Sequence, residues 1–172
     1  MKFLVKVNCS EEKLKAIGIG AIIILASTTV PYLLLLNVFF LAGIIIGGAA
    51  ASYYYIVTCQ ERLSMSEAFV FSSLTGMAGS TLSVIAEYVL ITEFNYRPGA
   101  TEFMTLSEQM KGVSLEQDMR INQLQEMLQA PVEMTFAGFL LSLVITAIIY
   151  APVAGLGGVF TVWRLKRQAV KK

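Results

Sequence analysis

The sequence predicts an all-α membrane protein with four transmembrane helices and an extracytoplasmic helical segment between the third and fourth. Two observations predict this class. The 172-residue chain is 56% hydrophobic and 15% charged, with a mean hydropathy of +0.67, whereas soluble domains are about 45–50% apolar and about 25% charged. Its uncharged runs also match a bilayer, whose core is crossed by about 20 helical residues. Residues 1–172 are therefore expected to form a single membrane domain.

The first two helices are predicted by the run of residues 16–60, which contains no charged residue. A run of this length suffices for two crossings, is far too long for one, and continues well past the apolar part of a signal peptide. The break is expected near residues 28–31 or at Asn37, because proline interrupts a helix and Asn37 is an amide inside an apolar sequence. The two expected helices cover about residues 13–31 and 37–58.

The third helix is expected to open with a capping box, in which the side chains of Ser64 and Glu67 bond each other's backbone N–H groups. It would cover about residues 66–91 and is the most polar of the four, so it should have neighbours on more than one side. The fourth helix is expected over about residues 134–163, or ~45 Å if fully helical. Tilt, a kink at Pro152 or projection into the headgroups must absorb the excess length.

The charges that flank these runs predict the orientation. The C-terminal tail carries five Lys and Arg residues without an acidic residue, and the N-terminal segment is also basic. Residues 92–133 carry three positive and seven negative side chains, a net charge of −4. Because positive flanks stay in the cytoplasm, four crossings place both termini there and residues 92–133 outside. An aromatic belt is expected at the inner interface, formed by Tyr53, Tyr54, Tyr55 and Trp163.

Residues 92–133 are too polar to insert into lipid and too long for a simple connection. Ser114 and Gln117 have the spacing of a second capping box, which would open a helix that ends at about Ala130. This helix could pack on the outer mouth of the bundle or on a hairpin partner, or it could be a docking face for an external helix. The contact in each case would be made by an apolar stripe along this helix, which consists of Ile121, Leu124, Met127 and Leu128.

Small residues recur at four-residue spacing in the later expected spans. Because lipid offers no hydrophobic driving force for helix pairing, close approach of the backbones through small side chains must supply the packing energy. The pattern is compatible with packing inside one chain or with homodimerisation through the second helix. The candidate packing residues are Gly43, Gly47, Gly48, Ser52, Gly76, Ser80, Ala147, Ala151 and Gly155.

Glu87 lies within the expected third span, inside an otherwise uncharged run from Ala68 to Thr92. Ionisable groups in a membrane are costly and often functional. Glu87 also lies about one turn from the expected end of its helix, where the side chain can snorkel to the interface. It is therefore either an interfacial or structurally hydrogen-bonded carboxylate, or a site that handles protons or cations.

The sequence gives no signature of catalysis, of a cofactor or of a metal site. It contains no His, the commonest general base and metal ligand. Cys9 and Cys59 form no CxxC motif and are interpreted as ordinary reduced thiols on the cytoplasmic side. Nucleotide and nucleophile-elbow motifs are absent from the sequence, and a net charge of +1 gives no case for nucleic-acid binding.

The order of these features resembles that of a family of uncharacterised bacterial membrane proteins with four transmembrane helices, each built around one domain of unknown function. The resemblance covers nearly all of residues 16–167. It implies the topology and a location in the bacterial inner membrane without implying an activity. The features that carry it are Gly43 and Gly47, the sequence LSMSEAF at residues 63–69, the Glu/Met/Gln-rich residues 108–127, Pro131 with Val132, and the basic residues after the last span.

The leading functional hypothesis is a non-enzymatic scaffold or accessory subunit of a membrane complex. Its expected partners are the lipid bilayer and either another membrane protein or a second copy of the chain. The alternative is a small transporter or channel-like oligomer that uses Glu87. An intramembrane enzyme is disfavoured because the sequence has neither His nor paired carboxylates.

Overall fold

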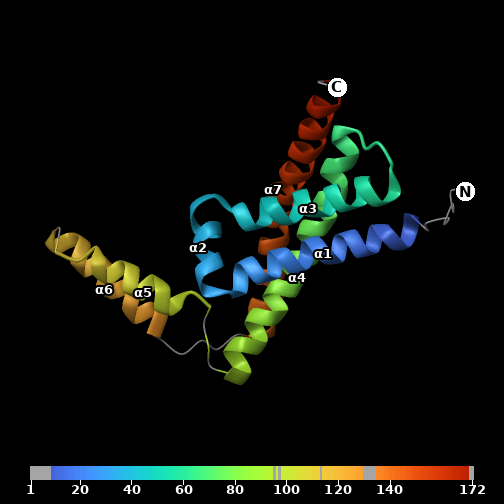
Figure 1. Cartoon of the computed structure of the whole chain (residues 1–172). Helices are drawn as coiled ribbons and strands as arrows, with labels where there is room; N and C mark the ends of the chain where they lie inside the picture. Colours follow the sequence, from blue (N-terminus) through green and yellow to red (C-terminus); the bar gives the residue numbers. More distant parts are fainter. Residues whose placement is uncertain (1–8, 95, 97, 113, 130–134, 171–172) are drawn as a thin grey trace, which may run out of the picture.

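The computed structural model describes residues 9–94, 96, 98–112, 114–129 and 135–170 (Figure 1). Every element in this described part is a helix, which confirms the all-helical prediction there. The elements are α1 (Cys9–Thr29), α2 (Pro31–Phe40), α3 (Ala42–Cys59), α4 (Met65–Phe94), α5 (Ala100–Gln109), α6 (Leu115–Gln129) and α7 (Phe136–Val170).

Three helices of the described residues are long and apolar enough to cross a membrane: Ala42–Cys59, Met65–Phe94 and Phe136–Ala169. By length and composition they identify a membrane protein. The helix α1 has 21 residues, but its first turns contain the charged residues Glu11, Glu12, Lys13 and Lys15. The uncharged remainder of α1, from residue 16 to 29, is ~21 Å long, less than the ~30 Å of a bilayer core.

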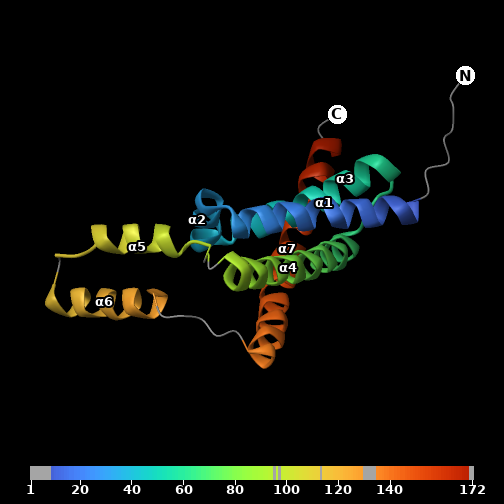
Figure 2. The same cartoon turned by 90° about the horizontal axis from the view of Figure 1, so that it is seen from below.

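The helices α1, α3, α4 and α7 form the body of the molecule. The helix α1 packs beside α3 and α4, and α7 packs beside the same two helices. The start of α1, the α3–α4 connection and the end of α7 lie toward one end of the molecule, and α5 and α6 extend from the other end (Figures 1 and 2). A fully buried cluster of Ile24, Ile44 and Ala154 lies where α1, α3 and α7 contribute to the core.

The helix expected over residues 37–58 is divided in the structure. Residues Pro31–Phe40 form the separate helix α2, and α3 begins only at Ala42. Leu41 lies between them in the left-handed backbone conformation, with φ of 51°. The break expected near residues 28–31 is present, because α1 ends at Thr29 and α2 begins at Pro31. Asn37, the alternative position, lies inside α2 and not at a break. The chain can interrupt the helix at Leu41 because the Asn37 side chain accepts a hydrogen bond from Gly43 N, a donor that the start of α3 would otherwise leave without a partner.

The other helix ends also differ from the expected ranges. Acidic residues stabilise a helix N-terminus, and α1 begins at Cys9 with Glu11 and Glu12 in its first turn. Basic residues stabilise a C-terminus, and α7 continues past residue 163 to Val170, with Arg167 in its last turn. Pro152 lies inside α7, where it does not end the helix.

The capping box at the start of α4 is confirmed. Ser64 N donates to Glu67 Oε2 at 2.7 Å, and Glu67 N donates to Ser64 Oγ at 3.2 Å. Each side chain thus bonds the other residue's backbone, as the spacing predicts. The box fixes the turn that follows α3 and therefore the position at which α4 begins.

The segment between α4 and α7 contains one helix more than expected. The helix α6 follows Ser114 as predicted, but α5 (Ala100–Gln109) has no counterpart in the sequence analysis. It starts after Gly99, which has φ of +82° and no side-chain cap. The two helices pack against each other as an antiparallel hairpin (Figure 2). We call this unit the α5–α6 hairpin.

Candidate functional site

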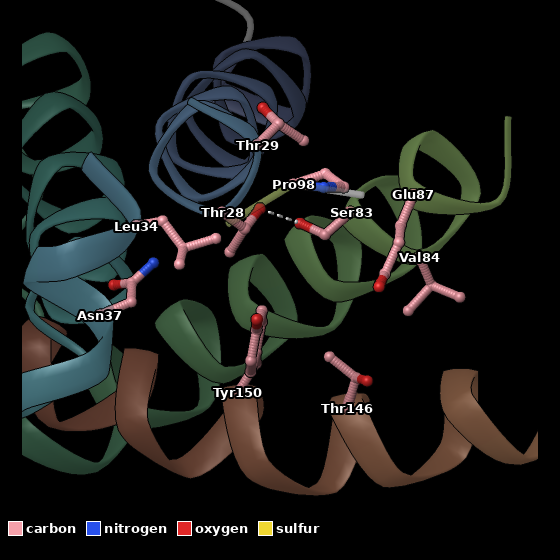
Figure 3. Close-up of a pocket in the computed structure, with 10 residues that line it drawn as sticks. All are labelled: Thr28, Thr29, Leu34, Asn37, Ser83, Val84, Glu87, Pro98, Thr146 and Tyr150. Carbon is pink, nitrogen blue, oxygen red and sulfur yellow. Dashed lines mark hydrogen bonds between the residues drawn. The ribbon is translucent and has the colours of Figure 1, made fainter. Parts of the chain in front are cut away.

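A cavity of about 300 Å³ lies where the end of α1 and the helix α2 approach α4 and α7 (Figure 3). Side chains from all four helices reach it, and its chemistry is mixed, as in many small-ligand sites. The polar lining residues are Thr28, Thr29, Asn37, Ser83, Glu87, Thr146 and Tyr150, and the apolar ones are Leu34, Val84 and Pro98.

One wall of the cavity is fixed by hydroxyl contacts between α1 and α4. The hydroxyl oxygens of Thr28 and Ser83 lie 2.9 Å apart, as the dashed line in Figure 3 marks. Thr28 also reaches the carbonyl oxygen of Leu25 at 2.9 Å, and Ser83 reaches that of Gly79 at 2.8 Å. Because hydroxyl groups in an apolar interior need partners, these contacts hold both side chains in place.

The Asn37 side chain fixes a second wall. Its amide nitrogen donates to the carbonyl oxygen of Ser27 at 2.9 Å and approaches Ser27 Oγ at 3.1 Å. Its carbonyl oxygen accepts from Gly43 N at 2.9 Å. Asn37 is 9% exposed, so these contacts are shielded from solvent. The buried amide therefore joins α1, α2 and α3 at the edge of the cavity.

Glu87 contributes the carboxylate of the cavity. The helix α4 continues seven residues beyond it to Phe94, so Glu87 lies about two turns from the helix end and not one. Its side chain is exposed in the isolated monomer. It points from α4 toward α7 (Figure 3). Its charge acts electrostatically on Tyr150, which lies with Thr146 on the opposite wall. One carboxylate among several hydroxyls suits a proton or a cation.

A metal centre is not built into the described residues, which contain no group of three or more His, Cys, Asp or Glu side chains able to hold an ion. The Glu87 cavity contains a single carboxylate among its lining residues. Its chemistry is therefore that of one acid surrounded by hydroxyl groups.

The candidate packing residues of α3 lie against other helices of the same chain. A Cβ atom on Gly47 would meet Ile24 of α1, one on Gly43 would meet Ser27 of α1, and one on Gly48 would overlap the backbone of Ala154 in α7. Ser52 is buried, with its Oγ 2.7 Å from Ser72 Oγ of α4. The small-residue face of α3 is thus occupied within the chain.

Two candidate packing glycines, Gly76 of α4 and Gly155 of α7, lie at the contact between these helices. A Cβ atom on Gly76 would come within 2.6 Å of the carbonyl oxygen of Tyr150, and one on Gly155 would come within 2.6 Å of Ser73 Oγ. Ser80 is fully buried, whereas Ala147 and Ala151 are half-buried.

Sequence reasoning missed several close contacts of the same kind. Gly20 of α1 faces Gly47, and its Cβ would lie 2.7 Å from the Gly47 carbonyl oxygen. Gly79 faces Ile24, and Gly158 faces Ala68 and Ser72. The buried residues Ala16, Gly20 and Ile24 have four-residue spacing, so the rule applied to the later helices would have found this face of α1.

The apolar stripe of α6 is only partly covered. Ile121 is 7% exposed, whereas Leu124 is 44% and Met127 is 71% exposed. The side chain of Leu128 lies outside the described residues. Ser107 of α5 is buried beside α6, where Gln125 Nε2 donates to its hydroxyl at 3.2 Å. The α5–α6 hairpin therefore buries one edge of the stripe and leaves the other exposed.

The capping box predicted at Ser114 forms only in part. Gln117 N donates to Ser114 Oγ at 3.2 Å, which confirms the N-cap. The Gln117 side chain instead donates to the carbonyl oxygen of Met110 across the hairpin turn, at 3.5 Å. Asp118 accepts from Gly112 N at 2.9 Å. The Gln117 side chain therefore bonds the turn between α5 and α6, and does not complete the capping box.

The aromatic belt prediction is wrong for Tyr55. Its side chain is fully buried, its hydroxyl donates to the Glu61 carboxylate, and its ring centroid lies 5.1 Å from that of Phe71. Tyr55 continues the buried face of α3 that includes Gly48 and Ser52, so the helical period turns it inward. Tyr53 and Trp163 are exposed.

The structure brings together two cysteines that the sequence treats separately. Cys9 begins α1 and Cys59 ends α3, and the two thiols lie close enough to influence each other electrostatically. Both are free cysteines. The contact follows from the antiparallel packing of α1 on α3, which residue spacing alone does not reveal.

No protein-family model matches the chain, and no curated protein or solved structure is detectably similar to it. The resemblance to bacterial membrane proteins with four transmembrane helices therefore stays a prediction.

Proposed function

We propose that the chain is an integral protein of the bacterial inner membrane with four spans and both termini in the cytoplasm. The proposal adds α1 to the three helices long enough to span. It is supported by the packing of α1 between α3 and α4, through a buried face that includes Gly20 and Ile24. The apolar sequence also continues past Thr29 into α2, and Lys15 can snorkel to the cytoplasmic interface.

Within that membrane, the protein acts as a non-enzymatic scaffold or accessory subunit of a complex. The position of the α5–α6 hairpin carries this proposal. The hairpin extends away from the body of the molecule (Figures 1 and 2). It exposes a set of large apolar side chains: Leu106, Met110, Leu115, Met119, Leu124 and Met127.

The charges of the hairpin indicate the chemistry of a partner. Arg120 and Glu116 of α6 pair with each other at 2.7 Å. Glu126 and Glu108 remain as exposed acids beside the apolar side chains. A complementary surface would therefore be apolar with a basic rim, and large exposed apolar patches of this kind mark interaction sites.

The test is recovery of a partner from the native membrane in mild detergent, with amine crosslinking before solubilisation. Leu115→Ser together with Met127→Ser removes two exposed apolar side chains of α6 and should abolish recovery. Asn122→Ser together with Gln123→Ser changes exposed polar residues of the same helix and should leave recovery unchanged. A wild-type chain that crosslinks to no partner, or a Leu115/Met127 variant that keeps its partner, contradicts the accessory role.

Asp118 is unsuitable for a charge-reversal test because it accepts the hydrogen bond from Gly112 N in the hairpin turn. Reversing it would disturb the turn as well as the surface charge. Glu126→Lys is the cleaner variant, since Glu126 is exposed and forms no ion pair with another described residue. It should weaken partner recovery without changing the hairpin.

A second candidate function is proton or cation transport by a small oligomer, and the Glu87 cavity favours it. In reconstituted vesicles, Glu87→Gln should abolish a proton or monovalent-cation flux and Glu87→Asp should retain part of it. Glu93→Gln, an exposed acid on the last turn of α4, is the matched control. Equal flux in the Glu87→Gln and wild-type proteins removes the transport function.

A further inference from the structure

A groove of about 500 Å³ lies between α3 and α7, separate from the Glu87 cavity. Its walls are apolar along most of its length and polar near the C-terminal part of α7. The apolar lining residues are Ile46, Ala49, Ala50, Phe160 and Leu165, and the polar ones are Tyr53, Thr161, Arg164 and Gln168.

The floor of the groove is fixed by backbone packing. A Cβ atom on Gly157 of α7 would overlap the carbonyl oxygen of Ile45, so the two helices approach closely there. Thr161 Oγ1 lies 3.2 Å from the carbonyl oxygen of Ala49, its hydrogen-bonding partner on α3. The helices α3 and α7 cross each other (Figure 1), and the groove lies between them. The groove is therefore a preformed feature of the α3–α7 pair.

The position of Arg164 relates the groove to the bilayer. Arg164 is the first charged residue after the long uncharged sequence that ends at Trp163. In a spanning helix, an aromatic residue followed by a cation marks the interface with the cytoplasm. Ile46 lies near the start of α3 and Tyr53 one and a half to two turns later, toward its inner end. The apolar walls thus run from the bilayer interior to the cation at the interface.

The charge of the groove is positive. Arg164 is its one cation, and its described lining contains no acidic side chain. Arg164 is exposed, and no described carboxylate forms an ion pair with it. A guanidinium group binds phosphate oxygens through two parallel hydrogen bonds. Gln168 and Tyr53 supply further hydrogen-bonding groups beside it.

We propose that this groove binds one anionic phospholipid from the cytoplasmic leaflet. One acyl chain lies along Ile46, Ala49 and Phe160, and the headgroup phosphate lies at Arg164. This assignment rests on the proposed topology, in which the end of α7 is cytoplasmic. A phospholipid fits because it is the abundant molecule that places an anion and a hydrocarbon chain at these two depths at once.

Arg167 provides a matched control. Its guanidinium lies 5.0 Å from the ring of Trp163 in a stacking arrangement and does not line the groove. Arg164→Gln and Arg167→Gln therefore remove the same charge from the same interface. A general attraction of the basic tail to anionic lipid would respond equally to both substitutions, whereas a site in the groove responds to the first alone.

The test uses fluorescence quenching by lipids with brominated acyl chains. Trp163 is the one tryptophan of the chain, so Phe160→Trp with Trp163→Phe moves the fluorophore to the groove wall. The full-length protein is reconstituted in phosphatidylcholine vesicles with increasing brominated phosphatidylglycerol, and in parallel with brominated phosphatidylcholine. We expect phosphatidylglycerol to bind the reporter site at least about threefold more tightly than phosphatidylcholine.

Adding Arg164→Gln should remove the preference for phosphatidylglycerol, so that the two lipids bind about equally. Adding Arg167→Gln should preserve the preference. Equal quenching by the two lipids, or a preference that survives Arg164→Gln, overturns the lipid site and leaves the spanning topology intact. Absence of quenching by either lipid overturns both, because the groove wall would then lie outside the bilayer.

Discussion

The side chain of Asn37 accepts a hydrogen bond from the backbone N–H of Gly43 at 2.9 Å. The same side chain donates to the carbonyl oxygen of Ser27 at 2.9 Å. These backbone groups belong to the start of α3 and the end of α1, where a helix leaves donors and acceptors without partners. In an apolar environment each such group would be costly. One buried amide on α2 therefore permits the chain to turn twice between α1 and α3.

Replacing Asn37 with Ala should destabilise the fold by about 2–3 kcal/mol, because Gly43 N and the Ser27 carbonyl would be buried without these partners. The free energy of unfolding can be measured in mixed detergent micelles with increasing denaturing detergent. Asn122→Ala on the exposed surface of α6 is the control and should have no effect. Wild-type stability in Asn37→Ala would contradict this role of the amide.

Glycines at helix contacts should be sensitive to a single added methyl group. A Cβ atom at Gly48 would overlap the backbone of Ala154, whereas one at Gly18 of α1 would meet nothing within 4 Å. We expect Gly48→Ala to cost about 1–3 kcal/mol through displacement of α7. Gly18→Ala should be neutral or stabilise by up to about 1 kcal/mol through helix propensity. Unfolding in mixed micelles ranks the two variants, and equal stabilities would refute the close approach of α3 and α7.

Two adjacent serines of α4 should respond in opposite ways. Ser72 Oγ donates to the carbonyl oxygen of Gly48 at 2.9 Å and lies 2.7 Å from Ser52 Oγ. Ser73 Oγ is buried and has no hydrogen-bonding partner among the described residues. Ser72→Ala should cost about 1–2 kcal/mol, whereas Ser73→Ala should leave stability unchanged or raise it by up to about 1 kcal/mol. The same unfolding assay compares the two variants. A Ser73→Ala variant less stable than Ser72→Ala would show that the α3–α4 hydroxyl contacts are misassigned.

The stability of the α1–α3 contact should depend on acid pH through Glu12. Lys15 Nζ donates a hydrogen bond to the Glu12 carboxylate at 2.9 Å. The Tyr54 hydroxyl donates a second hydrogen bond to the same carboxylate at 3.1 Å. The hydrogen bond from Lys15, followed by that from Tyr54, lowers the pKa of Glu12, although desolvation opposes the shift. A carboxyl group whose pKa is lower in the folded chain stabilises the fold above its unfolded pKa and loses that contribution as pH falls through the folded pKa.

We therefore expect the stability of the fold to decline as the pH falls below 4.5, the ordinary pKa of a glutamate. The decline should be smaller in Glu12→Gln. Thermal unfolding in detergent between pH 3 and pH 7 measures this. Glu11→Gln, an exposed neighbour, is the control and should keep the decline. A decline of the same size in Glu12→Gln would assign the acid sensitivity to other carboxyl groups.

Features set by neighbouring residues were predictable from the sequence, and features set by distant contacts were not. The cap of α4 depends on Ser64 and Glu67 alone, and its spacing is enough to predict it. The break at residue 30 was predictable from Pro31 beside it. The further break at Leu41 depends on a bond between Asn37 and Gly43 and on contacts to Ser27, so no local pattern predicts it. The helix α5 lacks a side-chain cap and packs on α6, which leaves little local signal.

The Glu87 cavity illustrates the same limit. Glu87 was identifiable because a carboxylate inside an otherwise uncharged apolar run, here Ala68 to Thr92, is unusual. Its neighbours Thr146 and Tyr150 come from α7, and Thr28 comes from α1, so no spacing rule unites them. For the same reason, the groove at Arg164 could not be separated in the sequence from a simple basic anchor after the last span.

The location of the two termini tests the central claim most directly, because α1 decides whether the number of crossings is even. In a Cys9→Ser, Cys59→Ser background, single cysteines are placed at Lys2, at Lys172 and at Gln123 of α6, and are labelled with a membrane-impermeant maleimide. The account predicts labelling of Gln123→Cys in intact cells, and labelling of both terminal cysteines only after the membrane is permeabilised. Labelling of one terminal cysteine in intact cells, with the other protected, would contradict four crossings.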